Sequence, residues 1–242
     1  LFERIKKLVQ AGRWHICGGW FLQPDCNLPA GESLVRQILC GRRYFQNKFG
    51  VAPDVAFNVD SFGHSRGLVQ ILAKCGYRAY LFGRPRQEDC PLRRPEFIWE
   101  GYDGSTILAT RFREWYNTSP GKARTEIETF IREHKDADMG VALWGVGDHG
   151  GGATMQDIED LSHLIEEHGD IQIRHSTPKG YFEELDGIRS DLPTIRKSMN
   201  PWAPGCYTSQ IAVKRRHRRL ENELYFCEKM CSAAAVQNLM EY

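Results

Sequence analysis

The sequence has no long apolar run, no excess of charge of either sign and no Cys-x-x-Cys pair. No window approaches the roughly 20 apolar residues that a membrane-spanning helix needs, so we expect no membrane partner. The 32 basic and 31 acidic residues leave a formal net charge of +1, which argues against a nucleic-acid partner because such binding depends on a basic surface. The first residues are charged and amphipathic, unlike a secretory signal peptide.

Eight cysteines are scattered along the chain at spacings that fit no zinc-ribbon template. We expect buried free thiols, as in a protein of the reducing cytoplasm, in preference to disulfides. The 242 residues are 41% hydrophobic and 11% aromatic, which predicts a folded core and not a disordered chain. Helical patterns without capping residues stand at both ends of the sequence, so we expect a fragment of a longer protein.

Short apolar runs alternate with amphipathic stretches up to about residue 185. Helical periodicity predicts a helix over 32–49 that ends at Gly50, and Thr154 with Asp157 resembles a capping box for a helix that runs through Glu167. The alternation favours a mostly parallel sheet or a barrel. Apolar alternation, the Asp103-Gly104 hairpin signal and the continuous apolar run at 139–146 predict strands at 55–59, 77–82, 97–102, 105–112, 139–146 and 171–175.

The pattern changes after about residue 185. Prolines at 193, 201 and 204 indicate a loop, and the spacing of Leu220, Leu224 and Cys227 predicts one long helix towards the end of the chain. We therefore predict an α/β domain over 1–190, a linker over 191–206 and the start of a second, helical domain over 207–242.

Three charged residues follow predicted strands, namely Asp60, Arg84 and Asp148. Working residues of parallel α/β folds lie just past the carboxyl ends of the strands, so these side chains are expected to converge on one face. A carboxylate at Asp60 could bind a metal ion or attack a carbon centre, and a nearby Arg84 would keep it ionised. The alternative is that Asp60 or Ser61 caps the helix that follows.

Asp148-His149-Gly150-Gly151-Gly152 forms a second group, in which three glycines permit a close approach by a ligand. The alternatives are a flexible turn before the helix at Thr154, and a phosphate cradle, which is disfavoured because the Lys-Ser/Thr of a P-loop is missing.

Aromatic residues are a third feature, because tryptophans near strand ends often stack on sugar rings. Trp144, in the run that leads to Asp148, and Phe62, beside Asp60, are the candidate site aromatics. For each tryptophan, packing in the core is the alternative. The six tryptophans are Trp14, Trp20, Trp99, Trp115, Trp144 and Trp202.

Four blocks of the sequence resemble glycoside hydrolase family 38, the α-mannosidases. FNVDSFGHSRGLVQILAKCGYRAYLFGRP resembles the segment that carries the family's catalytic aspartate, and GRWHICGGWFLQPDCNLPAGESLVRQ resembles the stretch before it. WGVGDHGGGAT is similar to the glycine-rich loop of the cytosolic and bacterial branch, and GCYTSQIAVKRRHRRLENEL to the junction with a helical middle domain. The blocks occur in the family's order and cover nearly the whole chain.

The resemblance implies an α/β fold in the form of a seven-stranded (β/α) barrel, incomplete at the N-terminus and followed by the start of a helical-bundle domain. It also implies a zinc ion and the retaining hydrolysis of α-mannosidic bonds in mannose-containing oligosaccharides, through a covalent glycosyl-enzyme intermediate. A cytoplasmic location and a homo-oligomer are further expectations from this family.

The resemblance assigns roles residue by residue. Asp60 matches the nucleophile, which is also a zinc ligand, and Asp148 falls where the family has its acid/base. Arg84 matches a contact of the nucleophile, and Phe62 an aromatic near the sugar. His149 would touch substrate or shape the loop. Retaining enzymes hold their two carboxyl groups about 5–5.5 Å apart.

The zinc ligands are where the sequence departs from the family. Neither the family's N-terminal His-x-Asp pair nor its later histidine before GCYTS has a match, so Asp60 alone is assigned to the metal and the other ligands are expected outside this chain. The chain by itself is therefore expected to be inactive. The alternatives are a non-catalytic sugar-binding relative and a metal-dependent carbohydrate deacetylase, whose His-x-x-x-His motif is missing.

Overall fold

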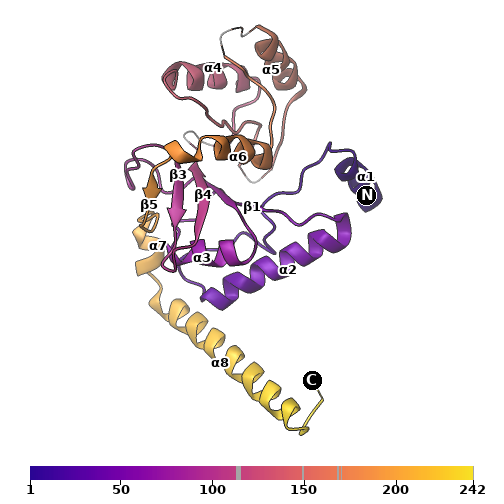
Figure 1. The fold of residues 1–242 in the computed structure, drawn as a ribbon, viewed down its shortest axis with the longest axis vertical. Coiled ribbons are helices and arrows are strands. Elements are labelled where there is room, and N and C mark those ends of the chain that lie inside the picture. The colour runs from indigo at the N-terminus through magenta and orange to yellow at the C-terminus, as the bar shows by residue number, and fades with distance from the viewer. Residues whose placement is uncertain (113–115, 149, 168, 170, 242) are drawn as a thin grey trace.

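The computed structural model describes residues 1–112, 116–148, 150–167, 169 and 171–241, in which a mixed sheet is surrounded by helices (Figure 1). The strands are β1 (Val55–Asn58), β2 (Ala79–Phe82), β3 (Glu96–Glu100), β4 (Thr106–Arg111) and β5 (Thr194–Ile195), in the order β1-β2-β4-β3-β5. The helices are α1 (Phe2–Gln10), α2 (Gly31–Phe49), α3 (Gly67–Lys74), α4 (Ala123–Glu133), α5 (Met155–Glu167), α6 (Pro178–Gly187), α7 (Pro204–Thr208) and α8 (Ile211–Val236).

The strand directions agree in large part with the expected parallel sheet. β1 is parallel to β2 and β2 to β4, and β5 is parallel to β3. β3 and β4 are antiparallel because they form the predicted hairpin, where Gly104 takes a φ of 83° and Asp103 Oδ1 accepts the Ser105 N–H at 3.0 Å.

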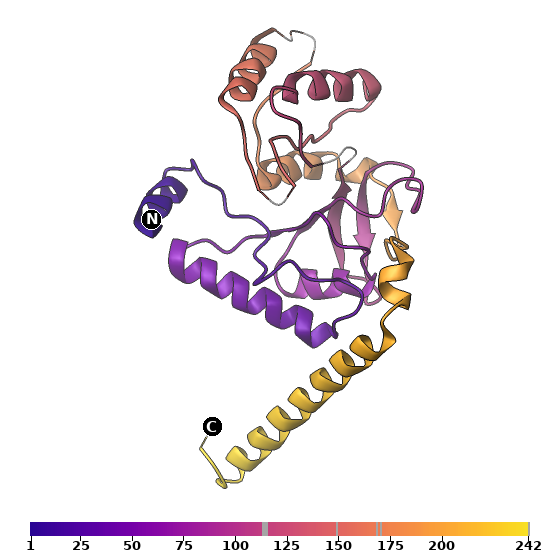
Figure 2. The same cartoon turned by 180° about the vertical axis from the view of Figure 1, so that it is seen from behind.

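Both faces of the sheet are covered, as Figures 1 and 2 show with α2 and α3 on one side and α6 on the other. Alternate residues of β2 supply the two cores. Tyr80 and Phe82 pack with the helices α2 and α3, whereas Leu81 packs with Phe182 of α6. The alternation of side chains along a strand thus explains why β2 is buried along its whole length.

Two predicted strands are wrong. Residues 139–146 and 171–175 form no strand, and the first of these runs is half-buried where full burial was expected. Val141 and Leu143 pack beside Phe182, and both segments line a cavity of about 630 Å³ that also borders α4 and α5. An apolar run does not by itself distinguish a strand from other buried backbone, and a strand also needs a neighbour for its hydrogen bonds.

The helices α4 and α6 were not predicted from the sequence. The start of α6 carried a recognisable signal, because Thr177 Oγ1 accepts the Gly180 N–H at 3.1 Å and Pro178 occupies the first turn. α4 packs with α5 through a small cluster of Ala123, Leu161 and Leu164.

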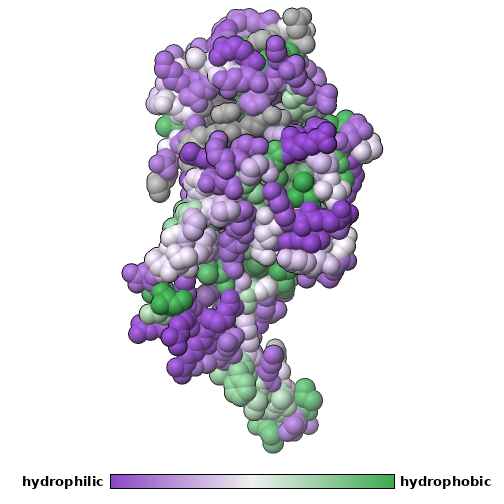
Figure 3. Space-filling view, turned by 90° about the vertical axis from the view of Figure 1, so that its left-hand side faces the viewer, coloured by the Kyte–Doolittle hydropathy of each residue, from purple (hydrophilic) through white to green (hydrophobic). Residues whose placement is uncertain are grey.

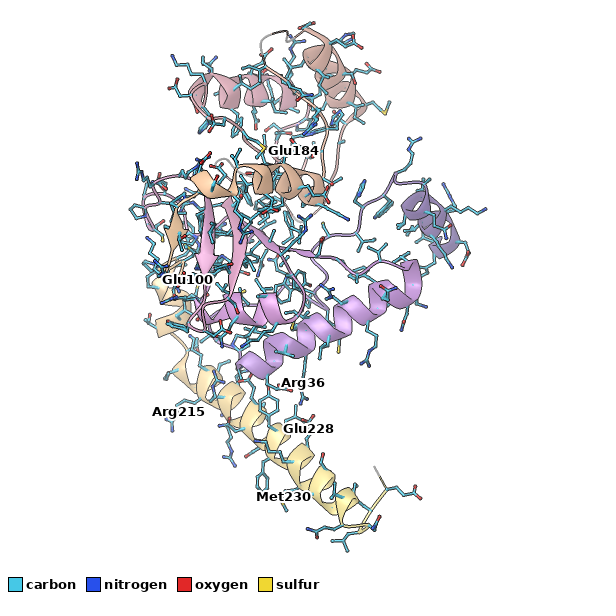
Figure 4. All side chains as sticks on the ribbon, viewed as in Figure 1. Arg36, Glu100, Glu184, Arg215, Glu228 and Met230 are labelled. Atoms are coloured by element: carbon cyan, nitrogen blue, oxygen red, sulfur yellow. The ribbon has the colours of Figure 1, made fainter. Side chains whose placement is uncertain are left out.

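The predicted long C-terminal helix is confirmed as α8, which contacts α2. Glu221 accepts the Ser33 hydroxyl at 2.6 Å, and Arg36 and Glu228 form an ion pair of 2.6 Å, the two side chains pointing toward each other in Figure 4. Exposed apolar side chains gather at the far end of this helix and just beyond it (Figure 3); they include Met230 in α8 and Leu239 after it. Within the segment interpreted as a linker, β5 joins the sheet; the division into domains stays a prediction.

The expectation of free thiols agrees with the structure, in which all eight cysteines are free. The predicted burial is confirmed for Cys26 and Cys90. It is wrong for the five exposed cysteines, which are Cys17, Cys40, Cys206, Cys227 and Cys231. In the part of the chain that the structure describes, no helix combines the length and apolarity needed to cross a membrane.

The predicted cap of α5 generates a first test. Asp157 is buried, and its carboxylate accepts the Thr154 hydroxyl at 2.6 Å and the N–H groups of Gly121 and Ala123 at 3.2 and 3.1 Å. Because Asp157→Ala leaves these donors unpaired, we expect a loss of about 2–3 kcal/mol in the free energy of unfolding, measured by urea denaturation. Glu159→Ala, at an exposed position of α5, should change it by less than about 0.5 kcal/mol. Equal losses in the two variants would contradict the role of the cap.

Candidate active site

The register of β1 and β2 brings Asp60 and Arg84 together. Asn58 is paired with Phe82, and Asp60 and Arg84 each follow two residues later, at the shared carboxyl edge of two parallel strands. Arg84 Nε donates to Asp60 Oδ1 in an ion pair. The expected convergence of these two residues is therefore present, and it follows from strand pairing.

The helix-cap alternative for Asp60 is wrong. α3 begins at Gly67 with Arg66 as its cap residue, so Asp60 lies in a loop well before the helix. This loop packs closely on the segment that precedes α7. At Gly63, whose φ is 137°, an added Cβ would lie 1.8 Å from Asn200 Oδ1. Because Asp60 does not cap α3, its carboxylate is available for chemistry.

The guanidinium of Arg84 lies over two aromatic rings. Its Cζ is 5.5 Å from the ring centroid of Phe62 and 4.7 Å from that of Trp202. The Arg84 side chain is 14% exposed and the Asp60 side chain 41%. A half-buried cation thus fixes a carboxylate that still faces solvent, where a substrate could reach it.

Asp148 lies in the glycine-rich loop, is exposed, and has a φ of 64°. A non-glycine residue at positive φ is uncommon, and such backbone often marks a functional loop. His149, the neighbour that was expected to touch substrate, lies outside the described residues.

Tyr116 links the two carboxylates electrostatically. Burial raises the pKa of its phenol, the negative charges of Asp60 and then Asp148 raise it further, and the charge of Arg84 lowers it. One phenol is thus within electrostatic range of both aspartates. Tyr116 was not predicted from the sequence, although it follows β4, whose carboxyl end shares the edge of β1 and β2.

Trp144, which was predicted as a site aromatic, is partly buried. It packs against the small cluster of α4 and α5, and its ring centroid lies 6.0 Å from that of His175. These contacts favour the alternative of core packing. Among the described tryptophans, Trp202, which was not singled out from the sequence, lies beside Arg84.

A buried polar layer lies beneath the site. His64 is fully buried, with Nε2 2.7 Å from the Arg84 carbonyl oxygen and Nδ1 2.8 Å from the Tyr80 hydroxyl. Burial lowers the pKa of His64 to about 4, although the hydrogen bond to Arg84 and the charge of Asp25 act in the opposite direction. Burial likewise raises the pKa of the Cys26 thiol to about 12.

The described residues do not by themselves complete a zinc site. Among them there is no group of three or more His, Cys, Asp or Glu side chains that could hold a metal ion. Asp60 is paired with the cation Arg84, whereas zinc needs three or four ligands. Among the described residues, Asp60 remains as the candidate ligand taken from the resemblance.

Polar residues at the carboxyl edge of parallel strands, in a sheet covered by helices, are typical of an α/β enzyme domain. Residues 1–203 match the family model "Glycosyl hydrolases family 38 N-terminal domain". The chain therefore belongs to glycosyl hydrolase family 38.

Known proteins agree with this assignment. The chain is 35% identical to alpha-mannosidase G of Dictyostelium discoideum, covering 96% of this chain and 22% of that protein. It is 29% identical to alpha-mannosidase 2C1 of Homo sapiens, covering 98% of this chain and 23% of that protein. It thus spans less than a quarter of the length of these relatives. An alpha-mannosidase from Enterococcus faecalis shares the fold, with a TM-score of 0.66 and 24% identity over 81% of this chain and 23% of that one.

The buried His64 predicts how stability depends on pH. The unfolded chain takes up a proton on this residue below about pH 6.5, whereas the folded protein holds it neutral down to about pH 4. The free energy of unfolding should therefore fall by about 3 kcal/mol as the pH drops through this window. Urea denaturation of His64→Gln should show a smaller fall in the free energy of unfolding. His217→Gln, at a half-exposed position of α8, should show the same fall as the unchanged protein. The same pH dependence in all three proteins would contradict the neutral state of His64.

Proposed function

We propose that the protein carrying this chain is an α-mannosidase that hydrolyses α-mannosidic bonds in mannose-containing oligosaccharides or glycans. The observation that carries the proposal is the Asp60–Arg84 pair at the carboxyl edge of β1 and β2, in a chain of family 38. The printed names of the relatives, alpha-mannosidase G and alpha-mannosidase 2C1, support the same substrate class.

In the proposed mechanism Asp60 attacks the anomeric carbon while Asp148 protonates the departing glycosidic oxygen. The C–O bond to the leaving group breaks as the bond to Asp60 forms. Asp148, now ionised, takes a proton from water, whose oxygen displaces Asp60, so that the configuration is retained after two inversions. The exposure of both carboxylates supports this pairing.

Arg84 has two tasks in this proposal. Its positive charge keeps Asp60 ionised, and its hydrogen bond to Oδ1 leaves Oδ2 as the attacking atom. Phe62 and Trp202, which flank Arg84, are proposed to pack against the sugar. Contacts of His149 and Trp144 with substrate stay predictions.

We further propose that Asp60 contributes one ligand to a zinc ion whose other ligands lie outside these 242 residues. The sheet described here is proposed to be part of a seven-stranded barrel, and α8 the start of a helical-bundle domain. A cytoplasmic location and a homo-oligomer also stay predictions.

A non-catalytic sugar-binding relative is the second candidate. One observation favours it: no cluster of three metal-binding side chains occurs among the described residues. Such a protein would bind mannosides through the aromatic residues and Arg84 without cleaving them, so measurements of turnover distinguish it from the enzyme.

Substitution of the two aspartates tests the mechanism in the whole protein. Asp60→Asn should lower kcat on the order of 10⁴-fold with every α-mannoside, because it removes the nucleophile. Asp148→Asn should lower kcat for an unactivated disaccharide by about 10²–10⁴-fold. With an aryl mannoside whose leaving group needs no proton, formation of the intermediate should be nearly unimpaired in Asp148→Asn.

Asp136→Asn, at an exposed position after α4, is the matched control and should keep the activity of the unchanged protein. Substantial turnover by Asp60→Asn would overturn the assignment of the nucleophile. Identical losses on both substrates in Asp148→Asn would overturn the assignment of the acid.

Metal removal tests the zinc proposal. We expect the purified whole protein to contain bound zinc and a chelator to abolish hydrolysis, with activity restored by added zinc. The metal content of Asp60→Asn should fall, because a ligand is lost. Full activity in a metal-free preparation would contradict the proposal.

A further inference from the structure

His64 lies beneath the candidate site, contacts several of its segments and is fully buried. Its backbone N–H donates to the Met199 carbonyl at 2.9 Å, and the Met199 N–H donates back at 2.8 Å. Its ring reaches the carbonyl of Arg84. The loop that carries Asp60 and Phe62, the segment that carries Trp202 and the residue Arg84 therefore all meet at His64.

The partners of the ring determine its tautomer. The Arg84 carbonyl oxygen can only accept a hydrogen bond, so Nε2 must carry the proton. In a neutral imidazole Nδ1 is then an acceptor, and the Tyr80 O–H, at 2.8 Å, donates to it. The Cys26 thiol donates to the Pro24 carbonyl oxygen at 3.7 Å and also lies 3.9 Å from the Tyr80 oxygen.

The surroundings hold the imidazole neutral and fixed in orientation. Its ring makes edge contacts with Tyr80 and Phe82, at centroid distances of 5.4 and 5.0 Å. Asp25 favours the protonated form, but burial outweighs it and leaves the pKa of His64 at about 4. The imidazole is therefore a fixed donor to Arg84 near neutral pH.

We propose that His64 is a positioning residue of the active site, whose Nε2–H holds Arg84 so that its guanidinium rests against Asp60, with Tyr80 fixing the required tautomer. This inference rests on the proposed function for its effect on turnover, whereas the tautomer itself does not depend on that function. The loop of Asp60 and the strand end of Arg84 are joined twice, by the ion pair outside and by His64 beneath.

The test compares two amide substitutions of His64 in the whole protein. The amide nitrogen of a glutamine side chain can reach the place of Nε2, whereas the shorter side chain of asparagine matches Nδ1 only. We therefore expect His64→Gln to keep kcat within about tenfold of the unchanged protein and His64→Asn to lose on the order of 100-fold, with KM less affected in both. A merely structural role would give equal losses in kcat.

Tyr80→Phe probes the tautomer while preserving the ring that packs on Phe82 and Trp99. It should lower kcat by about five- to tenfold, the effect of one neutral hydrogen bond. Tyr181→Phe, which removes another buried hydroxyl, 3.3 Å from Thr110 Oγ1 in the other core, is the matched control and should keep kcat unchanged.

Nitrogen-15 NMR of histidine-labelled protein gives a readout independent of turnover. We expect the His64 ring to be a neutral Nε2–H tautomer near pH 7. Tyr80→Phe should keep this form, because the Arg84 carbonyl still accepts from Nε2, but should shift the Nδ1 resonance, because the hydroxyl that donates to Nδ1 is lost. A charged ring or an Nδ1–H tautomer in the unchanged protein would overturn the inference. A protein that hydrolyses no α-mannoside but shows the expected tautomer would refute the proposed function and leave the positioning of Arg84 intact.

Discussion

The structure of the candidate site depends on the parallel pairing of β1 with β2. Because Asn58 lies opposite Phe82, the two strands end at the same edge of the sheet and at the same register. Asp60 and Arg84 therefore face each other two residues later. A shift of one residue would turn β2 over and exchange the side chains of its two cores. The buried Tyr80 and Leu81 on opposite faces therefore fix the register that makes the ion pair.

The features predictable from the sequence were local or carried by the resemblance. The Asp103-Gly104 hairpin, the Thr154–Asp157 cap and the helix that ends at Gly50 depend on a few adjacent residues, and all three are present. Asp60 and Arg84 were recognised as a pair because each follows a strand, and the family motif singled out the same residues.

What the sequence did not reveal depends on contacts across the chain. Residues 139–146 have the composition of a strand, but backbone pairing with another segment decides whether one forms. Trp144 and Trp202 look alike in the sequence, and only the fold shows that Trp202 lies beside Arg84. The position of His64 likewise depends on segments more than 100 residues apart, since its backbone is hydrogen-bonded to that of Met199.

The central claim is that Asp60 forms a bond with the sugar, and trapping of the intermediate tests it most directly. The whole protein would be treated with a fluorinated mannosyl fluoride, which slows breakdown of a glycosyl-enzyme, and its peptides analysed by mass spectrometry. The account predicts a mannosyl adduct on the peptide that contains Asp60, and its loss in Asp60→Asn. Turnover of the reagent with an adduct on another residue would contradict it.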